Sequence, residues 1–300
     1  MSYVSLVSVL YNCPDVLSDF FGGLSRQKFK DYHLFLIDNS SDDESYLESL
    51  RLINLFSLVQ NVTLIKNDTN VGISCANNQG ILMSLAENSK YTLLLNNDIT
   101  WESDDTLELM VSYSDINNTD MLVPKILFHD NRHIWCAGGG FTNYKGVTYH
   151  RGEGEIDSGQ YDFIAETDYA PTCFMLINND VFKHVGIMDE QFFVYYDDTD
   201  FIWRARKLGK QLTYFYKAVI CHKVSSSTGG NLSPFSIYQS TKNRIIFIRK
   251  NYSITSKIIA ISFLLSTRVL LLDIVLVSSL RKQLLKGIMD GFTVHLKNKG

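Results

Sequence analysis

Residues 91–98 read Tyr-Thr-Leu-Leu-Leu-Asn-Asn-Asp, a short apolar run that stops at three polar residues. Apolar runs of four to eight residues bounded by polar turns are typical of strands buried in a sheet. Three earlier stretches have the same form, at 4–12, 32–40 and 62–70. Helical patterns lie between the four runs, at 16–28, 43–57 and 74–88, with Ser74 as the expected cap of the last. This alternation predicts βαβ units that build a parallel sheet.

The polar clusters that end these strands are the first candidate site. Ligands of open α/β sheets bind outside the carboxyl ends of the strands, so we expect the clusters to line one crevice. Gly72 additionally allows a tight turn and a close approach of backbone to ligand. The cluster residues are Tyr11, Asn12, Asp38, Asn39, Asn70, Gly72, Asn96, Asn97 and Asp98.

The second half of the chain is less regular. Strands are expected at 121–128 and 172–177 and a helix at 197–207, whereas the glycine-rich stretch 129–160 is typical of hairpins and loops. The sequence has no G-x-G-x-x-G, G-x-x-x-x-G-K-[ST] or G-x-S-x-G motif. These absences disfavour a Rossmann oxidoreductase, a P-loop kinase and an α/β-hydrolase.

Composition indicates an ordinary globular enzyme, with 45% hydrophobic and 20% charged residues and only four prolines. The five cysteines are scattered and form no C-x-x-C pair, which argues against a disulfide framework or a zinc cluster. The N-terminus has no basic region, and its apolar run is too short for a signal peptide. We therefore expect reduced thiols and a cytoplasmic protein.

The net charge of −4 hides an asymmetry. Residues 242–300 carry 11 Lys and Arg against two acids, a net +9, and the rest of the chain carries −13. A basic tail suits anionic partners such as phospholipid, nucleic acid or a pyrophosphate-bearing acceptor. The apolar stretch 258–280 is interrupted by Arg268 and Asp273. These charges favour an interfacial amphipathic helix, with a packed helical subdomain or a true span as alternatives.

Two positions are candidate metal ligands. Asp98 ends a buried strand, where a carboxylate suits Mg²⁺ or Mn²⁺ that also binds phosphate oxygens. The alternative for Asp98 is an ordinary Asn/Asp turn. His222 follows an apolar, strand-like run and is either structural or a further ligand to Mn²⁺.

Other carboxylates are candidates for a catalytic base or for a contact to a nucleotide. Asp197, Asp198 and Asp200 follow a run of aromatic residues, and mutual repulsion together with a low local dielectric raises a carboxylate's pKa toward that of a useful base. The alternative is the acidic first turn of a helix. Asp38 could accept hydrogen bonds from a nucleobase or ribose, or form an Asx-turn or helix cap.

Taken in order, these segments resemble the family 2 glycosyltransferases with a GT-A fold, especially their rhamnosyltransferase-like branch. The resemblance covers roughly residues 3–250. Each motif is weak alone, and the specificity lies in six of them occurring in the family's order. The matching segments are 7–12, 36–42, 70–80 with Asn78, 93–98, 185–193 and 196–201.

The resemblance implies a mostly parallel α/β sheet flanked by helices over residues 1–240 and a helical, basic and apolar extension over 241–300. It implies Mg²⁺ or Mn²⁺ at Asp98 and His222. Asp197 and Asp198 match the family's Glu-Asp pair, whose second member is the usual base, with Asp197 in place of Glu. Asn96 stands where many relatives have Asp, which weakens a two-carboxylate metal site. The residues implied to bind nucleotide are Tyr11, Asn12, Asp38 (at the base), Asn39, Asn70, Gly72, Asn78, Asn96 and Asn97.

The implied reaction is an inverting transfer from a nucleotide-sugar donor to a saccharide acceptor, free or lipid-linked, in bacterial surface polysaccharide synthesis. The favoured donor is dTDP-rhamnose, with UDP-hexose, UDP-galactofuranose and UDP-N-acetylhexosamine as alternatives. The enzyme is expected on the inner face of the membrane, bound to its anionic surface, with no nucleic-acid partner. Residues 11–14 lack a glycine-rich phosphate loop, which argues against a nucleotidyltransferase. An inactive nucleotide-sugar-binding scaffold is the alternative from a different class.

Overall fold

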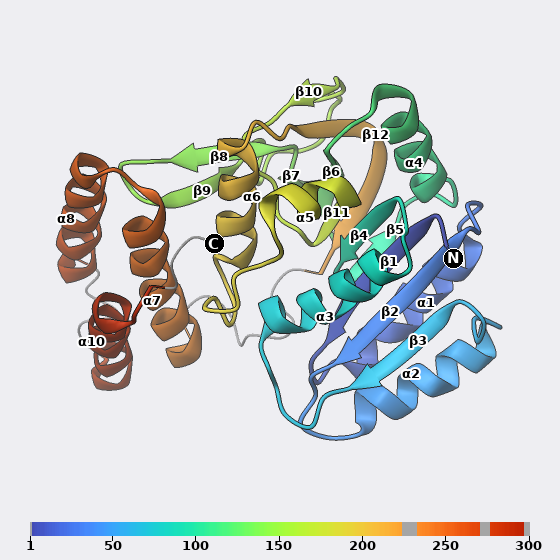
Figure 1. The fold of residues 1–300 in the computed structure, drawn as a ribbon, viewed down its shortest axis with the longest axis horizontal. Helices are drawn as coiled ribbons and strands as arrows, with labels where there is room; N and C mark the ends of the chain where they lie inside the picture. Colours follow the sequence, from blue (N-terminus) through green and yellow to red (C-terminus); the bar gives the residue numbers. More distant parts are fainter. Residues whose placement is uncertain (1, 224–232, 271–276, 297–300) are drawn as a thin grey trace.

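The computed structural model describes residues 2–223, 233–270 and 277–296. Its main sheet has the strand order β10-β12-β6-β11-β4-β1-β2-β3, with β5 and β7 paired at the side (Figure 1). The first half of the chain forms β1 (Val4–Leu10), α1 (Leu17–Arg26), β2 (Tyr32–Asp38), α2 (Glu44–Leu55), β3 (Val62–Lys66), α3 (Ile73–Ala86) and β4 (Tyr91–Leu95). Strand β1 pairs in parallel with β2 and β4, and β2 in parallel with β3. The predicted βαβ architecture is therefore confirmed.

One local prediction in this half is wrong. Helix α3 begins at Ile73 with Gly72 as its N-cap, and Ser74 is not the cap. The Ser74 hydroxyl instead donates a hydrogen bond to the carbonyl of Phe192, which lies in the segment before a later helix. A tertiary contact has thus taken the hydroxyl that local propensity would assign to the helix terminus.

The second half adds antiparallel pairing. It contains β5 (Ile99–Trp101), α4 (Thr106–Asn117), β6 (Met121–Phe128), β7 (Ile134–Cys136), β8 (Gly139–Thr142), β9 (Val147–His150), β10 (Ala165–Glu166), β11 (Phe174–Asn178), α5 (Asn179–Val185), α6 (Asp197–Lys207) and β12 (Leu212–His222). Strand β11 lies antiparallel between β4 and β6, which makes the sheet mixed. Strands β8 and β9 form the separate hairpin expected in the glycine-rich region.

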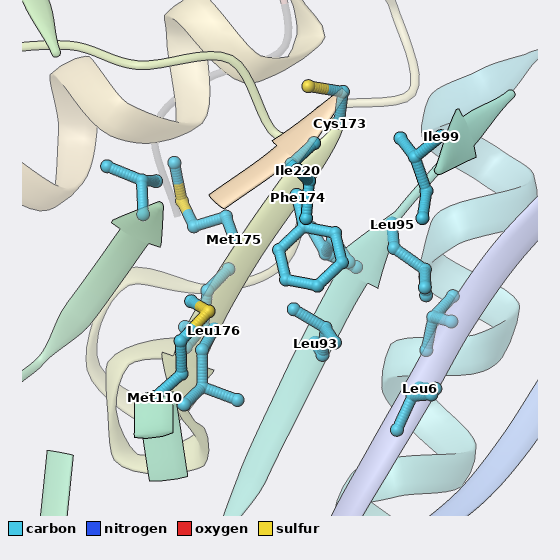
Figure 2. Close-up of a cluster of buried hydrophobic side chains, with 14 of the residues drawn as sticks. Leu6, Leu93, Leu95, Ile99, Met110, Cys173, Phe174, Met175, Leu176 and Ile220 are labelled. Atoms are coloured by element: carbon cyan, nitrogen blue, oxygen red, sulfur yellow. The ribbon is translucent and has the colours of Figure 1, made fainter. Parts of the chain in front are cut away.

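One part of the main hydrophobic core lies where β11 joins the parallel strands. Figure 2 shows Phe174 of β11 facing Leu93 and Leu95 of β4, with Ile220 of β12 beside it. The Phe174 ring meets Trp101 edge to face, with 5.1 Å between ring centroids. Such contacts bury large apolar surfaces and fix β4 and β12 relative to each other, which holds the ends of both strands in place.

Three further helices follow β12: α7 (Pro234–Asn251), α8 (Ile254–Leu270) and α10 (Ser278–Thr293). Helix α10 packs closely on α7 because Gly287 and Gly291 leave no side chain between them; a Cβ at Gly287 would lie 2.8 Å from the Tyr238 carbonyl oxygen. A boundary at 240/241 falls inside α7. None of the described helices combines the length and apolar character needed to cross a bilayer. Part of the predicted amphipathic stretch, residues 271–276, lies outside the described residues.

Candidate functional site

A cavity of about 1100 Å³ opens at the carboxyl ends of the parallel strands, beside the first turns of α6 and α7. It brings together most of the residues singled out in the sequence. Those on its wall are Tyr11, Asn39, Asn70, Gly72, Asn96, Asn97, Asp98, Asp197, Asp198 and His222. Asn12, Asp38 and Asn78 do not line it.

Asp98 and His222 lie together at one side of this cavity. Strand β5 begins one residue after Asp98, and it pairs antiparallel with β12 so that Ile99 lies opposite His222. As a result, Oδ1 of Asp98 is 3.0 Å from Nε2 of His222, and both residues are buried. The amide nitrogen of Asn96 also lies 3.2 Å from the same imidazole nitrogen.

This pair can supply two metal ligands. Among the described residues, no three His, Cys, Asp or Glu side chains converge as a complete metal site. A divalent ion that binds a diphosphate needs only one or two protein ligands, because phosphate and water oxygens complete its shell. The carboxylate oxygen and imidazole nitrogen fit Mn²⁺ best, since Mg²⁺ prefers oxygen ligands alone. The Nδ1 atom of His222 is buried without a hydrogen-bond partner among the described residues, unlike the outer nitrogen of most metal-bound histidines.

Asp197 and Asp198 begin α6 at another part of the wall. Tyr195 and Tyr196 precede them with φ values of 63° and 67°, so the chain turns sharply into the helix. Asp197 is buried, and burial together with the charge of Asp198 raises its pKa to about 8. Asp198 is only half-buried and is therefore the carboxylate that a bound acceptor can reach.

Both oxygens of Asp198 are held by hydrogen bonds. Oδ2 accepts from the hydroxyl of Tyr169 at 2.7 Å, and Oδ1 accepts from the backbone N–H of Thr199 at 2.5 Å and from its hydroxyl at 3.1 Å. These bonds hold the Asp198 carboxylate at the cavity wall, where it can act as a proton acceptor.

The raised pKa of Asp197 predicts a pH-dependent effect on stability. Because the folded-state pKa lies above the ordinary value of 3.8, this group favours the folded state at low pH, and that contribution is lost as pH rises toward about 8. Asp197→Asn removes the titration. We expect the melting temperature of Asp197→Asn, relative to that of the unmodified protein, to increase between pH 5 and pH 8.

Asp68→Asn, at an exposed loop carboxylate, is the control for this comparison. Its melting temperature should differ from that of the unmodified protein by the same amount at both pH values. A pH-independent difference for Asp197→Asn would show that Asp197 is ionised in the folded protein across this range.

Three of the predicted nucleotide-binding residues have structural contacts instead of a place on the wall. Asn78 donates to the Met188 carbonyl and accepts from the Met188 N–H, both at 3.0 Å, and so anchors the segment before α6. Asn12 accepts from the backbone N–H of Ser41. Asp38 is fully buried; its Oδ1 accepts from the N–H of Ser40, and its Oδ2 has no partner among the described residues.

Gly72 lies on the wall, and its close approach is to a neighbouring loop. At φ 85°, a Cβ on Gly72 would be 2.6 Å from the Phe193 ring and 2.7 Å from the Phe193 carbonyl oxygen. The glycine therefore lets the start of α3 pack against the segment before α6. Asn97 makes a similar link, since its amide donates to the Val9 carbonyl at 3.1 Å.

Several wall residues were not identified from the sequence. Trp135 packs on His222 with 4.6 Å between ring centroids, and Tyr169 bonds Asp198. Others come from the hairpin and the first turn of α7, namely Val147, Thr148, Ser233, Pro234, Phe235 and Ser236. The only signal for the first group was the concentration of glycine and aromatic residues in 129–175, which gives no geometry.

Comparisons with known proteins identify the family and the fold of the chain. The family model described as Glycosyl transferase family 2 matches residues 5–186, a segment that ends before Asp197, Asp198 and His222. The low-salt glycan biosynthesis hexosyltransferase Agl10 of Haloferax volcanii is 25% identical over 250 residues, 81% of this chain and 74% of that protein. The dTDP-rhamnosyl transferase RfbF of Shigella flexneri is 22% identical over 258 residues, 84% of this chain and 81% of that protein.

Among solved structures, residues 1–349 of S. aureus TarS in complex with UDP-GlcNAc align with a TM-score of 0.63 at 14% identity, covering 97% of this chain and 80% of that one. This chain spans 41% of the longer TarS chain. The likeness confirms the predicted GT-A fold. Since the family model covers more than half of the sequence, this chain belongs to glycosyl transferase family 2.

Proposed function

We propose that this protein is an inverting, metal-dependent glycosyltransferase that moves a sugar from a nucleoside-diphosphate carrier to a hydroxyl of a saccharide acceptor. The observation that carries the proposal is a single cavity lined by both the Asp98–His222 pair and the hydrogen-bonded carboxylate of Asp198. Such a cavity offers a place for a diphosphate and a base for an attacking hydroxyl.

Asp198 is the proposed base. It would remove the acceptor hydroxyl's proton as the oxygen attacks the anomeric carbon from the face opposite the departing diphosphate. One displacement forms the new glycosidic bond, breaks the bond to the diphosphate and inverts the anomeric carbon. No enzyme nucleophile is needed in this scheme.

Asp98 and His222 are the proposed ligands of Mg²⁺ or Mn²⁺. When bound, the ion neutralises charge on the departing diphosphate. Asn96 lies beside His222 and can hold the imidazole in its orientation. The proposed nucleotide contacts are the wall residues Tyr11, Asn39, Asn70, Gly72, Asn96 and Asn97.

For the donor, we propose dTDP-rhamnose, in keeping with the similarity to a dTDP-rhamnosyl transferase. UDP-hexose, UDP-galactofuranose and UDP-N-acetylhexosamine are the alternatives, and TarS of the same fold was solved with UDP-GlcNAc. A thermal-shift panel of these donors, each with Mn²⁺ and with EDTA, distinguishes them. We expect a Mn²⁺-dependent rise in melting temperature with dTDP-rhamnose; a rise with UDP-sugars alone would change the donor, and no rise with any donor would contradict the transferase proposal.

We also propose that residues 241–300 attach the catalytic part, 1–240, to the anionic inner surface of the cell membrane, where a lipid-linked acceptor would lie. Helix α8 exposes Ile254, Ile258 and Leu265 along one side, and α10 exposes Leu285, Met289 and Phe292. Exposed cations, among them Arg281, Lys282 and Lys286, accompany these apolar residues. Apolar side chains with neighbouring basic residues are the combination that binds anionic membrane interfaces.

Charge reversal tests this attachment in the full-length chain. Arg281→Glu with Lys282→Glu should reduce binding to vesicles containing phosphatidylglycerol by roughly 10-fold or more, because each surface cation contributes about 1 kcal/mol. Lys28→Glu with Lys30→Glu makes the same charge change near α1, at the far side of the molecule from α8 and α10 (Figure 1). Equal vesicle binding by both double variants would refute a specific role for α10.

A further inference from the structure

The Asp198 carboxylate has one contact that its own helix does not provide. Tyr169 lies in the loop between β10 and β11, is 4% exposed, and lines the same cavity. Its hydroxyl donates to Oδ2 of Asp198 at 2.7 Å, whereas both contacts to Oδ1 come from Thr199 within α6. The tyrosine therefore fixes the rotation of a carboxylate that would otherwise be held at one oxygen.

The Tyr169 ring is itself held by the glycine-rich hairpin β8–β9. The His150 ring stacks on it with 6.0 Å between centroids and 15° between planes, and Phe141 meets it edge to face at 5.7 Å. The backbone N–H of Tyr169 donates to the Gly139 carbonyl at 3.2 Å. Gly139 must be glycine there, because a Cβ would lie 2.0 Å from the Tyr149 carbonyl oxygen.

The Tyr169 hydroxyl stays a donor over the working pH range. Burial, followed by the charge of Asp198, raises the pKa of Tyr169 well above 10. The side chain of Thr148, on β9, also hydrogen-bonds to this phenol. A protonated phenol beside a carboxylate must place its hydrogen toward the charge, so the direction of the bond is fixed.

We propose that Tyr169 is a positioning residue for the transfer reaction: it orients Asp198 so that a free lone pair of the carboxylate meets the acceptor hydroxyl. The proposal rests on the function proposed above. It assigns the β8–β9 hairpin a part in catalysis, because hairpin residues hold the tyrosine that holds the base. Pre-organised hydrogen bonds of this kind lower the reorganisation needed when the proton moves.

The test is Tyr169→Phe, which keeps the ring and its contacts with His150 and Phe141 and removes only the hydroxyl. The matched control is Tyr214→Phe: Tyr214 is fully buried, its hydroxyl donates to the Tyr161 carbonyl at 3.2 Å, and it is not on the cavity wall.

We expect Tyr169→Phe to lower kcat roughly 10- to 100-fold, as for loss of one hydrogen bond to a charged group, with the donor KM little changed. The acid limb of its kcat–pH profile should move to higher pH, because the ionised carboxylate has lost a donor. Tyr214→Phe should leave both kcat and the kcat–pH profile unchanged.

The outcomes separate this proposal from the proposed function. If Asp198→Asn is inactive while Tyr169→Phe keeps the kcat and pH profile of the unmodified enzyme, Tyr169 has no positioning role. If both tyrosine variants lose activity in proportion to their loss of melting temperature, the effect is structural and the proposal is likewise overturned. If the unmodified protein transfers no sugar, or Asp198→Asn remains fully active, it is the proposed function or its base that fails.

Discussion

Asp198→Asn is expected to lower kcat by roughly 10²- to 10⁴-fold, the usual contribution of a positioned general base. The donor's dissociation constant should stay within experimental error of the unmodified value, because the change is nearly isosteric. The Asn side-chain oxygen can still accept from Tyr169 or from Thr199, so the first turn of α6 should keep its structure. Steady-state kinetics with the donor found in the thermal-shift panel, together with donor binding by calorimetry, measures both quantities.

Asp168→Asn is the control for this variant, since it makes the same chemical change at an exposed carboxylate that pairs with Arg206 off the cavity wall. It should leave kcat unchanged. Normal turnover by Asp198→Asn would mean that the base is elsewhere. Asp197 would then be the next candidate, because its pKa of about 8 suits proton transfer near neutral pH.

The parallel part of the fold follows closely from the sequence. Strand β4 ends at Leu95 and strand β2 at Asp38, where the apolar runs meet their polar clusters. This agreement has a physical cause. A strand covered by helices on both faces is largely apolar, and most of its larger polar residues lie at the ends where ligands enter.

The mixed part could not be predicted in the same way. Strand β11 lies between β4 and β6 in the sheet, although it follows both of them in the chain and is separated from β6 by β7 to β10. Nothing in the residues of β11 specifies these two neighbours. The approach of Asp98 and His222, 124 residues apart, likewise depends on the pairing of β5 with β12. Strand pairing over such separations is a property of the whole sheet, so the sequence indicates the two proposed ligands only as separate candidates.

The predicted nucleotide-binding residues show a different limit of prediction from sequence. Asn78 and Asn12 stand in motif segments, which predicts a place in the site, yet their amides bond to neighbouring loops. Local pattern locates the polar cluster at the end of a strand or the start of a helix. It cannot tell which member faces the cavity and which holds the loop, because that depends on side-chain direction. Tyr169 could not be predicted for another reason: its loop has no periodic pattern.

His222→Ala is expected to raise the Mn²⁺ concentration for half-maximal activity by at least about 10-fold, since loss of even an outer-shell partner costs that much in other metal sites. The imidazole supplies one of the two proposed protein ligands, and Asp98 alone would hold the ion more weakly. Removing metal from the unmodified enzyme with EDTA should abolish transfer, and added Mn²⁺ should restore it. A Mn²⁺ titration of initial rates measures the shift.

Two further variants make the metal test specific. His184→Ala removes an exposed histidine on α5 and should leave the titration unchanged. Asp98→Asn keeps the size of the other proposed ligand but removes its charge. It should raise the Mn²⁺ concentration for half-maximal activity at least as much as His222→Ala does, because a divalent cation is held chiefly by the carboxylate. If His222→Ala titrates like the unmodified enzyme while Asp98→Asn does not, the histidine only orients the carboxylate, and the remaining ligands must come from the donor diphosphate and water. If neither variant alters the titration, the ion binds elsewhere in the cavity and the assignment of this pair is wrong.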